Sequence, residues 1–252
     1  MLLIKRVNNQ KIPIALIDLL RTAQRVVVLT GAGTSAESGV PTFRDAQTGL
    51  WARYDPKELA TPEAFKRNPR LVWEWYSWRR ELVMQAKPNP GHLALVKMQA
   101  QVPELILITQ NVDGMHQRAG NQQVIELHGN LTRSRCAGYL VESWPPTEEV
   151  PPPCPHCGGP LRPDVVWFGE PLPAEALHQA IAILRECDII LSIGTSSIVQ
   201  PAASLPYEGL EYGAKLVEIN PEKTPLTPDV HFALLGKSGE VLPNLVEQTW
   251  PS

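Results

Sequence analysis

Apolar residues in this chain gather in short unbroken runs that are rich in valine and isoleucine and end in small or polar residues. Four runs are clear: Val26–Leu29, Leu105–Ile108, Ile189–Ile193 and Leu216–Ile219. Because no polar residue alternates within them, they are typical of parallel strands that are buried on both faces of a sheet. The shorter stretch Val124–Leu127 predicts a fifth strand.

Segments with helical character lie between these runs. Ile14–Arg21 precedes the first strand, His92–Gln99 precedes the second, and Ala174–Arg185 precedes the third. The alternation of helices and buried strands predicts an α/β fold, namely a Rossmann-like, doubly wound parallel sheet.

Two segments interrupt the alternation. Residues 45–85 are helix-like and contain four of the seven tryptophans, whereas residues 132–162 contain three of the four cysteines and seven prolines. We interpret them as a helical insertion and a zinc-ribbon-like insertion that form one smaller lobe. Segments 1–44, 86–131 and 163–252 then make up the Rossmann-like domain.

Composition narrows the possible partners. The 252 residues include 43% apolar residues, which is enough for one large domain with insertions. A net charge of −3 leaves no basic field for nucleic acid, so a sequence-reading DNA protein is excluded.

Cysteine use and the apolar runs bear on location. The N-terminal residues lack the apolar core of a signal peptide, and no apolar run is long enough to span a bilayer. Four cysteines without an export signal are typical of reduced thiols. We therefore expect a cytoplasmic globular protein with no membrane partner. The sequence does not set its oligomeric state, and a monomer is compatible with it.

The first strand runs into a glycine loop, Gly31-Ala32-Gly33-Thr34-Ser35-Ala36. The loop fits the dinucleotide fingerprint, in which glycines allow a tight turn and bring backbone N–H groups close to a pyrophosphate. An ordinary glycine-rich turn is the alternative. The acidic residue that the fingerprint places about 20 positions later is missing, since residues 41–51 are loop-like. The first crossover is therefore not that of an ordinary dehydrogenase.

Polar residues follow the other predicted strands. Gln110-Asn111-Val112-Asp113, His128, Gly194-Thr195-Ser196 and Asn220 all come directly after an apolar run. Ligands bind at the carboxyl ends of parallel strands, and a neutral imidazole there could accept a proton from a sugar hydroxyl. The alternatives are an Asx turn for the asparagine and aspartate and a plain turn histidine. We expect the remaining histidines to be structural: His92, His116, His156, His178 and His231.

The run GAGTSAESGVPTFRDAQTGLW resembles the signature of the sirtuins, the NAD-dependent protein-lysine deacylases. Further blocks follow in the order of that family: TQNVDG at 109–114, ELHGN at 126–130, VVWFGE at 165–170, GTS at 194–196 and EIN at 218–220. The resemblance extends over about residues 25–245.

The resemblance implies a reaction and assigns roles to residues. NAD would be consumed, and the products would be nicotinamide, free lysine and an O-acyl-ADP-ribose. His128 would be the general base, and Asn111 and Asp113 would complete the catalytic set by forming the nicotinamide pocket. The implied NAD contacts are Gly31, Ala32, Gly33, Ser35, Phe43, Arg44, Trp51, Gln110, Asn111, Val112, Asp113, Gly194, Thr195, Ser196, Asn220 and Ser238.

Two segments are expected to meet the acyl-lysine protein or peptide. By resemblance, the β-prone residues Val166, Trp167, Phe168 and Gly169 pair with the peptide backbone; an internal edge strand is the alternative.

A helix is predicted over 71–84, with a core stripe of Leu71, Trp75, Trp78 and Leu82. On its neighbouring face, Tyr76 and Arg79 resemble the pair of the desuccinylase and demalonylase branch, in which an arginine binds the distal carboxylate. The alternative is an arginine that snorkels at the rim of the helix.

The resemblance leaves further functions open. An NAD-dependent dehydrogenase fits the loop after the first strand poorly. An NAD or acyl-peptide binding module with little catalysis is a second possibility, and a protein ADP-ribosyltransferase is a third.

The cysteines match the structural zinc site of the sirtuins incompletely. That family carries two C-x-x-C pairs, and here Tyr139 stands where the second cysteine is expected. We expect zinc on Cys136, Cys154 and Cys157. A closed structural zinc site has four ligands, so the fourth ligand would come from another residue or from a water. A site without metal is the alternative, and Cys187 is expected to be buried in the core. The candidates for the fourth ligand are a water, Glu142, Glu148, Glu149 and His156.

Overall fold

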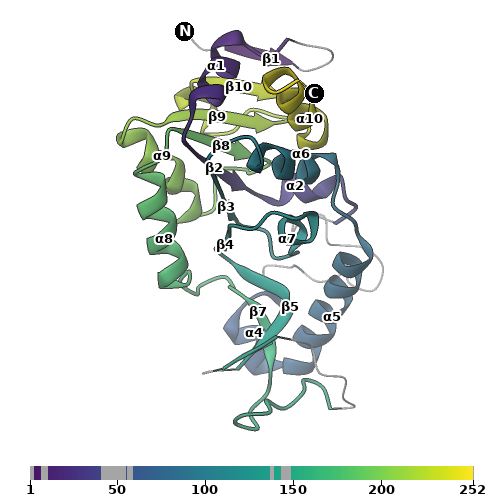
Figure 1. Cartoon of the computed structure of the whole chain (residues 1–252). Helices are drawn as coiled ribbons and strands as arrows, with labels where there is room; N and C mark the ends of the chain where they lie inside the picture. The colour runs from purple at the N-terminus through teal and green to yellow at the C-terminus, as the bar shows by residue number, and fades with distance from the viewer. Residues whose placement is uncertain are drawn as a thin grey trace.

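A computed structural model gives the structure of the chain and describes residues 3–6, 11–40, 55, 59–136, 139–142 and 149–251. Among these residues, one large sheet runs through the molecule (Figure 1). Its strands are β1 (Leu3–Arg6), β2 (Arg25–Thr30), β3 (Glu104–Thr109), β4 (Val124–Glu126), β8 (Ile189–Ile193), β9 (Lys215–Asn220) and β10 (Phe232–Leu235). They pair in the order β1-β10-β9-β8-β2-β3-β4, and every pair is parallel.

All five strands predicted from the apolar runs are confirmed, each within one residue at either end. The pattern missed β1 and β10, which are four residues long and form the end of the sheet beyond β9. A search for runs rich in valine and isoleucine passes over both, because Phe232–Leu235 contains neither residue and Leu3–Arg6 ends in two basic residues.

Helices cover both faces of this sheet, as Figure 1 shows. On one face lie α1 (Ile14–Thr22), α6 (Pro90–Gln99) and α10 (Ser238–Thr249), and on the other lie α8 (Ala174–Leu184) and α9 (Leu205–Glu211). Alternate residues of β2 serve the two layers, since Val26 and Val28 pack with the first group and Val27 with the second. The predicted doubly wound α/β fold is confirmed.

Short elements complete the larger lobe. They are α2 (Ala32–Ala36), α7 (Met115–Ala119), and the 3-10 turns η2 (Ala202–Ser204) and η3 (Thr227–Asp229). None of the described helices combines the length and the apolar character that a bilayer crossing requires.

A second, antiparallel sheet stands at the far end of the molecule from β1 (Figure 1). It consists of β6 (Leu140–Val141), β5 (Gly129–Arg135) and β7 (Arg162–Val165), and it packs with α4 (Pro62–Arg67) and α5 (Pro69–Gln85). Two apolar clusters hold these elements together. One is centred on Trp75, Tyr76 and Trp167, and the other contains Trp73 together with cysteines 136 and 154.

Helix α5 forms where the sequence predicts it, but its buried face is different. Asn68 caps it by accepting a hydrogen bond from the Leu71 N–H at 3.1 Å. The buried side chains of α5 are Val72, Trp73, Trp75, Tyr76 and Val83. Of the predicted stripe only Trp75 is among them, because α5 has packing partners on two sides, the segment around Trp167 and the cysteine loops.

Candidate active site

The register of the large sheet brings the predicted polar segments together at one edge, the one formed by the carboxyl-terminal ends of its parallel strands. Thr30 at the end of β2 pairs with Thr109 of β3 on one side and with Ile193 of β8 on the other. Thr109 in turn pairs with Glu126, so β8, β2, β3 and β4 end in one row. The chain leaves β2 toward β3, whereas β8 lies on the opposite side, which makes this edge a topological switch point where α/β proteins bind ligands.

Two glycine loops meet backbone to backbone at this edge. The Gly33 N–H donates to the Gly194 carbonyl at 2.8 Å, and the Gly31 N–H donates to the Ile193 carbonyl at 3.1 Å. Gly194 has a φ of +60°, and a Cβ there would overlap the backbone nitrogen of Thr34. The N–H groups of Gly31 and Gly33 themselves are thus bound to the neighbouring loop, and the approach of backbone N–H groups of this loop to a pyrophosphate stays a prediction.

Asn111 is buried between β2 and β3 and is fixed by its amide. Its Nδ2 donates to the Gly31 carbonyl at 3.0 Å and to Ser35 Oγ at 3.2 Å. Both protons of the amide are thus engaged within the protein, and Oδ1 is the atom left to accept from a ligand.

Asp113 is also buried, and its Oδ1 accepts from the Met115 N–H at 2.9 Å. This bond is the Asx-type turn that the sequence offered as the alternative to a binding role. The second carboxylate oxygen is not used by that turn, so the turn and a ligand contact are compatible. Val112, between these two residues, accepts from the Leu131 N–H through its carbonyl and ties the segment to β5.

His128 lies in the turn between β4 and β5, and one hydrogen bond defines its protonation. Its Nδ1 lies 2.9 Å from the carbonyl oxygen of Gln110. Because a carbonyl can only accept, Nδ1 carries the proton, and the lone pair of the neutral ring is on Nε2. Burial lowers the pKa of His128 below its usual value, while the bond to Gln110 opposes that shift. A neutral imidazole with a basic Nε2 is the form that a general base needs.

A buried polar layer lies beneath these groups, and the sequence did not reveal it. His116 Nε2 is 2.9 Å from Thr30 Oγ1, which donates to Thr109 Oγ1 at 2.8 Å. The Asn111 N–H donates to that same threonine at 3.0 Å. Burial lowers the pKa of His116 to about 3, so this histidine stays neutral. The threonines that end the apolar runs of β2 and β3 were the only signal of it in the sequence.

The remaining predicted NAD contacts lie at the same edge with different exposure. Gln110 Nε2 donates to Thr195 Oγ1 at 3.2 Å and so links the ends of β3 and β8. Asn220, at the end of β9, donates through Nδ2 to the Glu222 carbonyl at 2.9 Å. Ala32 is exposed, while Gly33, Thr195 and Ser196 are half-buried.

Ser238 is buried at the start of α10, and its hydroxyl is engaged. It donates to a carboxylate oxygen of Glu37 at 3.1 Å, which joins α10 to the turn after α2. Three predicted NAD contacts, Phe43, Arg44 and Trp51, lie outside the described residues.

The segment predicted to pair with a peptide is not a strand. Strand β7 ends at Val165, and the backbone N–H groups of the next three residues all donate within the protein. Their acceptors are the His128 carbonyl for Val166, the Glu170 carboxylate for Trp167 and the Ala60 carbonyl for Phe168. The prediction of an open strand edge is wrong for these groups, because the chain turns at Phe168 and Gly169, where φ is +85°.

Tyr76 lies beside that segment, and Arg79 follows one turn later on α5. The hydroxyl of Tyr76 accepts a hydrogen bond from Trp167 Nε1 at 3.1 Å, and burial raises the pKa of this phenol to about 12. The guanidinium of Arg79 lies 5.2 Å from the ring centroid of Trp75, and burial lowers its pKa. Arg162 stacks on the indole of Trp167 at 3.3 Å. The phenol of Tyr76 thus contacts the segment after β7, and the buried guanidinium of Arg79 lies one helical turn along α5 from Tyr76.

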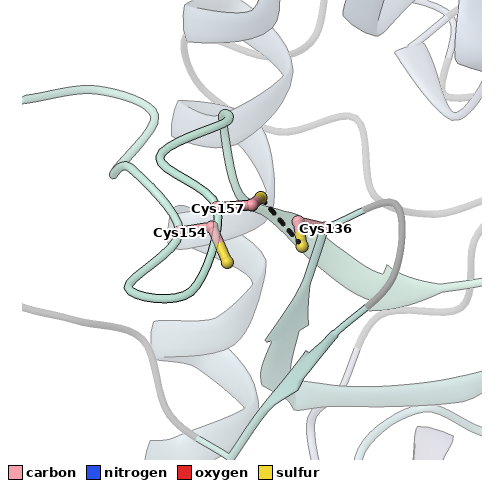
Figure 2. Close-up of side chains that lie close together, drawn as sticks. All are labelled: Cys136, Cys154 and Cys157. Atoms are coloured by element: carbon pink, nitrogen blue, oxygen red, sulfur yellow. Dashed lines mark hydrogen bonds between the residues drawn. The ribbon is translucent and has the colours of Figure 1, made fainter.

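Three cysteines come together as the sequence predicts (Figure 2). The sulfurs of Cys136, Cys154 and Cys157 all lie within 4.8 Å of one another, and those of Cys136 and Cys157 are 3.6 Å apart. Tetrahedral zinc with bonds of about 2.3 Å separates its sulfurs by about 3.8 Å, so the spacing fits zinc. Cys187 is buried elsewhere, where its thiol donates to the Leu184 carbonyl, as predicted.

No fourth protein ligand joins the cluster within the part of the chain that the structure describes. The candidates Glu142, Glu149 and His156 are not part of this group, and Glu148 lies outside the described residues. Of the ligands considered from the sequence, the described geometry leaves open a water and Glu148.

Known proteins resemble this chain in both sequence and fold. A model of the Sir2 family matches residues 31–201. The NAD-dependent protein deacylase 2 of Pyrobaculum aerophilum is 54% identical over 235 residues, which cover 92% of this chain and 93% of that protein. A crystal structure of a Sir2 homolog–NAD complex is similar with a TM-score of 0.88 and 46% identity, covering 95% of this chain and 94% of that one. A mutant Sir2 homologue bound to 2′-O-acetyl ADP ribose is similar with a TM-score of 0.85 and 47% identity, covering 93% and 95% of the two chains.

Proposed function

The chain belongs to the Sir2 family and is an NAD-dependent protein deacylase, and we propose that its acyl pocket favours succinyl and malonyl groups over acetyl groups. Its substrates are acylated proteins or peptides. The observation that carries the proposed chemistry is the bond from His128 Nδ1 to the Gln110 carbonyl. It fixes the ring so that Nε2 is the base, and burial keeps that base neutral near pH 7.

NAD, when bound, supplies a ribose with a hydroxyl for His128 to deprotonate and a nicotinamide that can leave. We assign the carboxamide of that nicotinamide to Asn111 Oδ1 and to the Asp113 oxygen that the Met115 N–H does not use. Both side chains are buried and held by the backbone, so they can orient a planar amide without reorganising.

The acyl preference rests on Tyr76 and Arg79. A carboxylate at the far end of a succinyl group would bind the guanidinium through two parallel hydrogen bonds. Tyr76 accepts from Trp167, so its own proton is available to the same carboxylate. The methyl group of an acetyl substrate offers the guanidinium no acceptor and no opposite charge, which is why acetyl is the poorer substrate.

The reaction is tested by mass spectrometry of a succinyl-lysine peptide incubated with and without NAD. Loss of the acyl mass together with release of nicotinamide is expected only when NAD is present. His128→Ala is expected to bind NAD and to turn over very slowly. Normal turnover by that variant would refute the role of His128, and a mass gain on protein would instead show ADP-ribosyl transfer.

The acyl preference is tested by kcat/KM on matched succinyl- and acetyl-lysine peptides. Arg79→Met is expected to lose about 10- to 100-fold on the succinyl peptide, the usual worth of a hydrogen bond to a charged group, and to change little on the acetyl peptide. Arg70→Met is the control, because Arg70 lies on the same helix, is exposed and pairs with Glu74 one turn away. If Arg79→Met keeps its succinyl activity, the assignment of the pocket fails while deacylation stands.

A further inference from the structure

Position 139 belongs to the cysteine cluster by its place in the backbone. The Cys136 N–H donates to the Tyr139 carbonyl at 2.9 Å, so the chain returns to Cys136 three residues later. Cys157 likewise follows Cys154 by three residues, although in that loop the Cys154 N–H donates to the Gly159 carbonyl at 2.7 Å. Three of these four positions carry a cysteine whose sulfur belongs to the cluster (Figure 2).

The side chain at position 139 does not point into the cluster but lies against the opposite loop. The Tyr139 ring stacks on His156 with a centroid distance of 4.8 Å and an angle of 23° between the planes. His156 stands between the two cysteines of that loop. Tyr139 is 50% exposed, and Cys157 is exposed as well, so this side of the cluster faces solvent. The other side is closed, because Cys136 and Cys154 are buried against Trp73.

We propose that the three thiolates hold zinc with its fourth coordination position open to solvent beside Tyr139, where a water binds that a small thiol can displace. Three protein ligands and one exchangeable water are the arrangement of open zinc sites, whereas closed sites have four protein ligands. The stacked rings of Tyr139 and His156 connect the two loops in place of the missing metal–sulfur bond.

The charge balance is consistent with an exchangeable ligand. Three thiolates and a divalent ion leave one net negative charge, and a fourth thiolate would raise it to two. A neutral water therefore suits the site when no thiol is present, and a small thiol that binds does so by releasing its proton to solvent. No electron is transferred in this exchange, and the zinc–water bond is replaced by a zinc–sulfur bond.

Cobalt substitution tests the open position independently of deacylation. The full-length protein is loaded with Co²⁺ under a reductant that is not a thiol, and its absorption spectrum is recorded before and after 2-mercaptoethanol is added. Each cobalt–thiolate bond adds charge-transfer absorption. The wild type starts with three such bonds, so we expect 2-mercaptoethanol to add absorption equal to about one further bond.

Two substitutions of the same residue separate the alternatives. Tyr139→Phe keeps the ring and is expected to respond to 2-mercaptoethanol as the wild type does. If the phenol oxygen were the fourth ligand, the two proteins would respond differently. Tyr139→Cys supplies the missing thiolate and is expected to show the full intensity at once, to ignore 2-mercaptoethanol, and to release zinc to a chromogenic chelator about tenfold more slowly.

Two results would overturn the proposal. A wild type that binds Co²⁺ but does not respond to 2-mercaptoethanol has its fourth position filled by the protein. A wild type that binds no Co²⁺, while Tyr139→Cys does bind it, has lost the metal site with the cysteine. Circular dichroism and NAD binding of each variant confirm that the fold is kept.

Discussion

At His128, a hydrogen bond to a backbone carbonyl determines which ring nitrogen can act as a base. The Gln110 carbonyl that accepts from Nδ1 is itself fixed, because the Gln110 N–H donates to the Thr30 carbonyl at the end of β2. The His128 carbonyl in turn accepts from the Val166 N–H. The ring of His128 is thus held by the residue that follows β3, and its backbone is held by the residue that follows β7.

The pH dependence of the reaction follows from this environment. Burial lowers the pKa of His128, so the neutral base persists below the ordinary value of 6.5 and is lost only as the pH falls through the lowered pKa. We expect kcat/KM to show an acidic limb with an apparent pKa below 6.5, measured on one peptide at saturating NAD. His178→Gln, a change at an exposed histidine, should leave the profile unchanged. An acidic limb at or above pH 7 would contradict the assignment.

The contact between the two glycine loops leads to a second prediction, on fold stability and NAD binding. Gly194→Ala should destabilise the fold and weaken NAD binding, because the added Cβ meets the Thr34 backbone at a positive φ. The positive φ alone costs about 1–2 kcal/mol. Gly213→Ala is the control, since its φ is +96° but nothing lies within 4 Å of the added carbon. Urea unfolding and NAD titration should show a loss of binding for Gly194→Ala only.

At the scale of elements, Arg133 of β5 joins the two sheets. Its guanidinium lies 2.7 Å from Glu126 at the end of β4 and 2.9 Å from Asp164 of β7. His128 lies in the turn between Glu126 and the start of β5, so these ion pairs stabilise the turn that carries the base. All three side chains are at least three-quarters buried. Each charge is therefore stabilised mainly by its ion-pair partners and little by water.

Removing Arg133 should therefore cost more than removing a surface arginine. Arg133→Met leaves two largely buried carboxylates without their shared cation, and we expect it to lower the free energy of unfolding by about 2 kcal/mol. Arg70→Met breaks an exposed i,i+4 pair with Glu74 and should cost less than about 0.5 kcal/mol. Urea unfolding measures both, and equal losses would show that the cluster has no special role.

At the scale of the whole molecule, the large sheet and the second sheet have separate apolar cores. We propose that the lobes correspond to the segments inferred from the sequence, with 45–85 and 132–162 as the inserted lobe. The second sheet extends beyond the segment 132–162 at both ends, because β5 begins at Gly129 and β7 ends at Val165.

Metal removal should affect one lobe more than the other. The cysteine cluster packs on Trp73 of α5, away from the cores that flank the large sheet. We expect a chelator to lower the thermal transition and to change tryptophan fluorescence, because the loops that cover Trp73 loosen, while NAD affinity changes less than about threefold. A Trp73→Phe variant should lose the fluorescence change. Equal loss of NAD binding would show that the lobes are not independent.

The sequence predicted the α/β fold, five of the seven described strands of the central sheet and the grouping of polar residues at their ends. These features depend on local patterns, since a buried strand must be apolar throughout and the register of a parallel sheet brings its strand ends together. The three cysteines were expected together from the resemblance to the sirtuin zinc site, in which Cys154 and Cys157 form a complete C-x-x-C pair and Tyr139 replaces one thiol.

Only the tertiary structure decided which groups are already engaged. Local periodicity could not tell that α5 packs on two sides, that the N–H of Gly33 binds the Gly194 loop, or that the N–H groups after Val165 are used within the protein. Each of these depends on a partner that is distant in the sequence, and a backbone donor carries no mark of its acceptor in the chain. The order of the residues thus determined which chemistry is present, and the packing determined which atoms of it remain free to act.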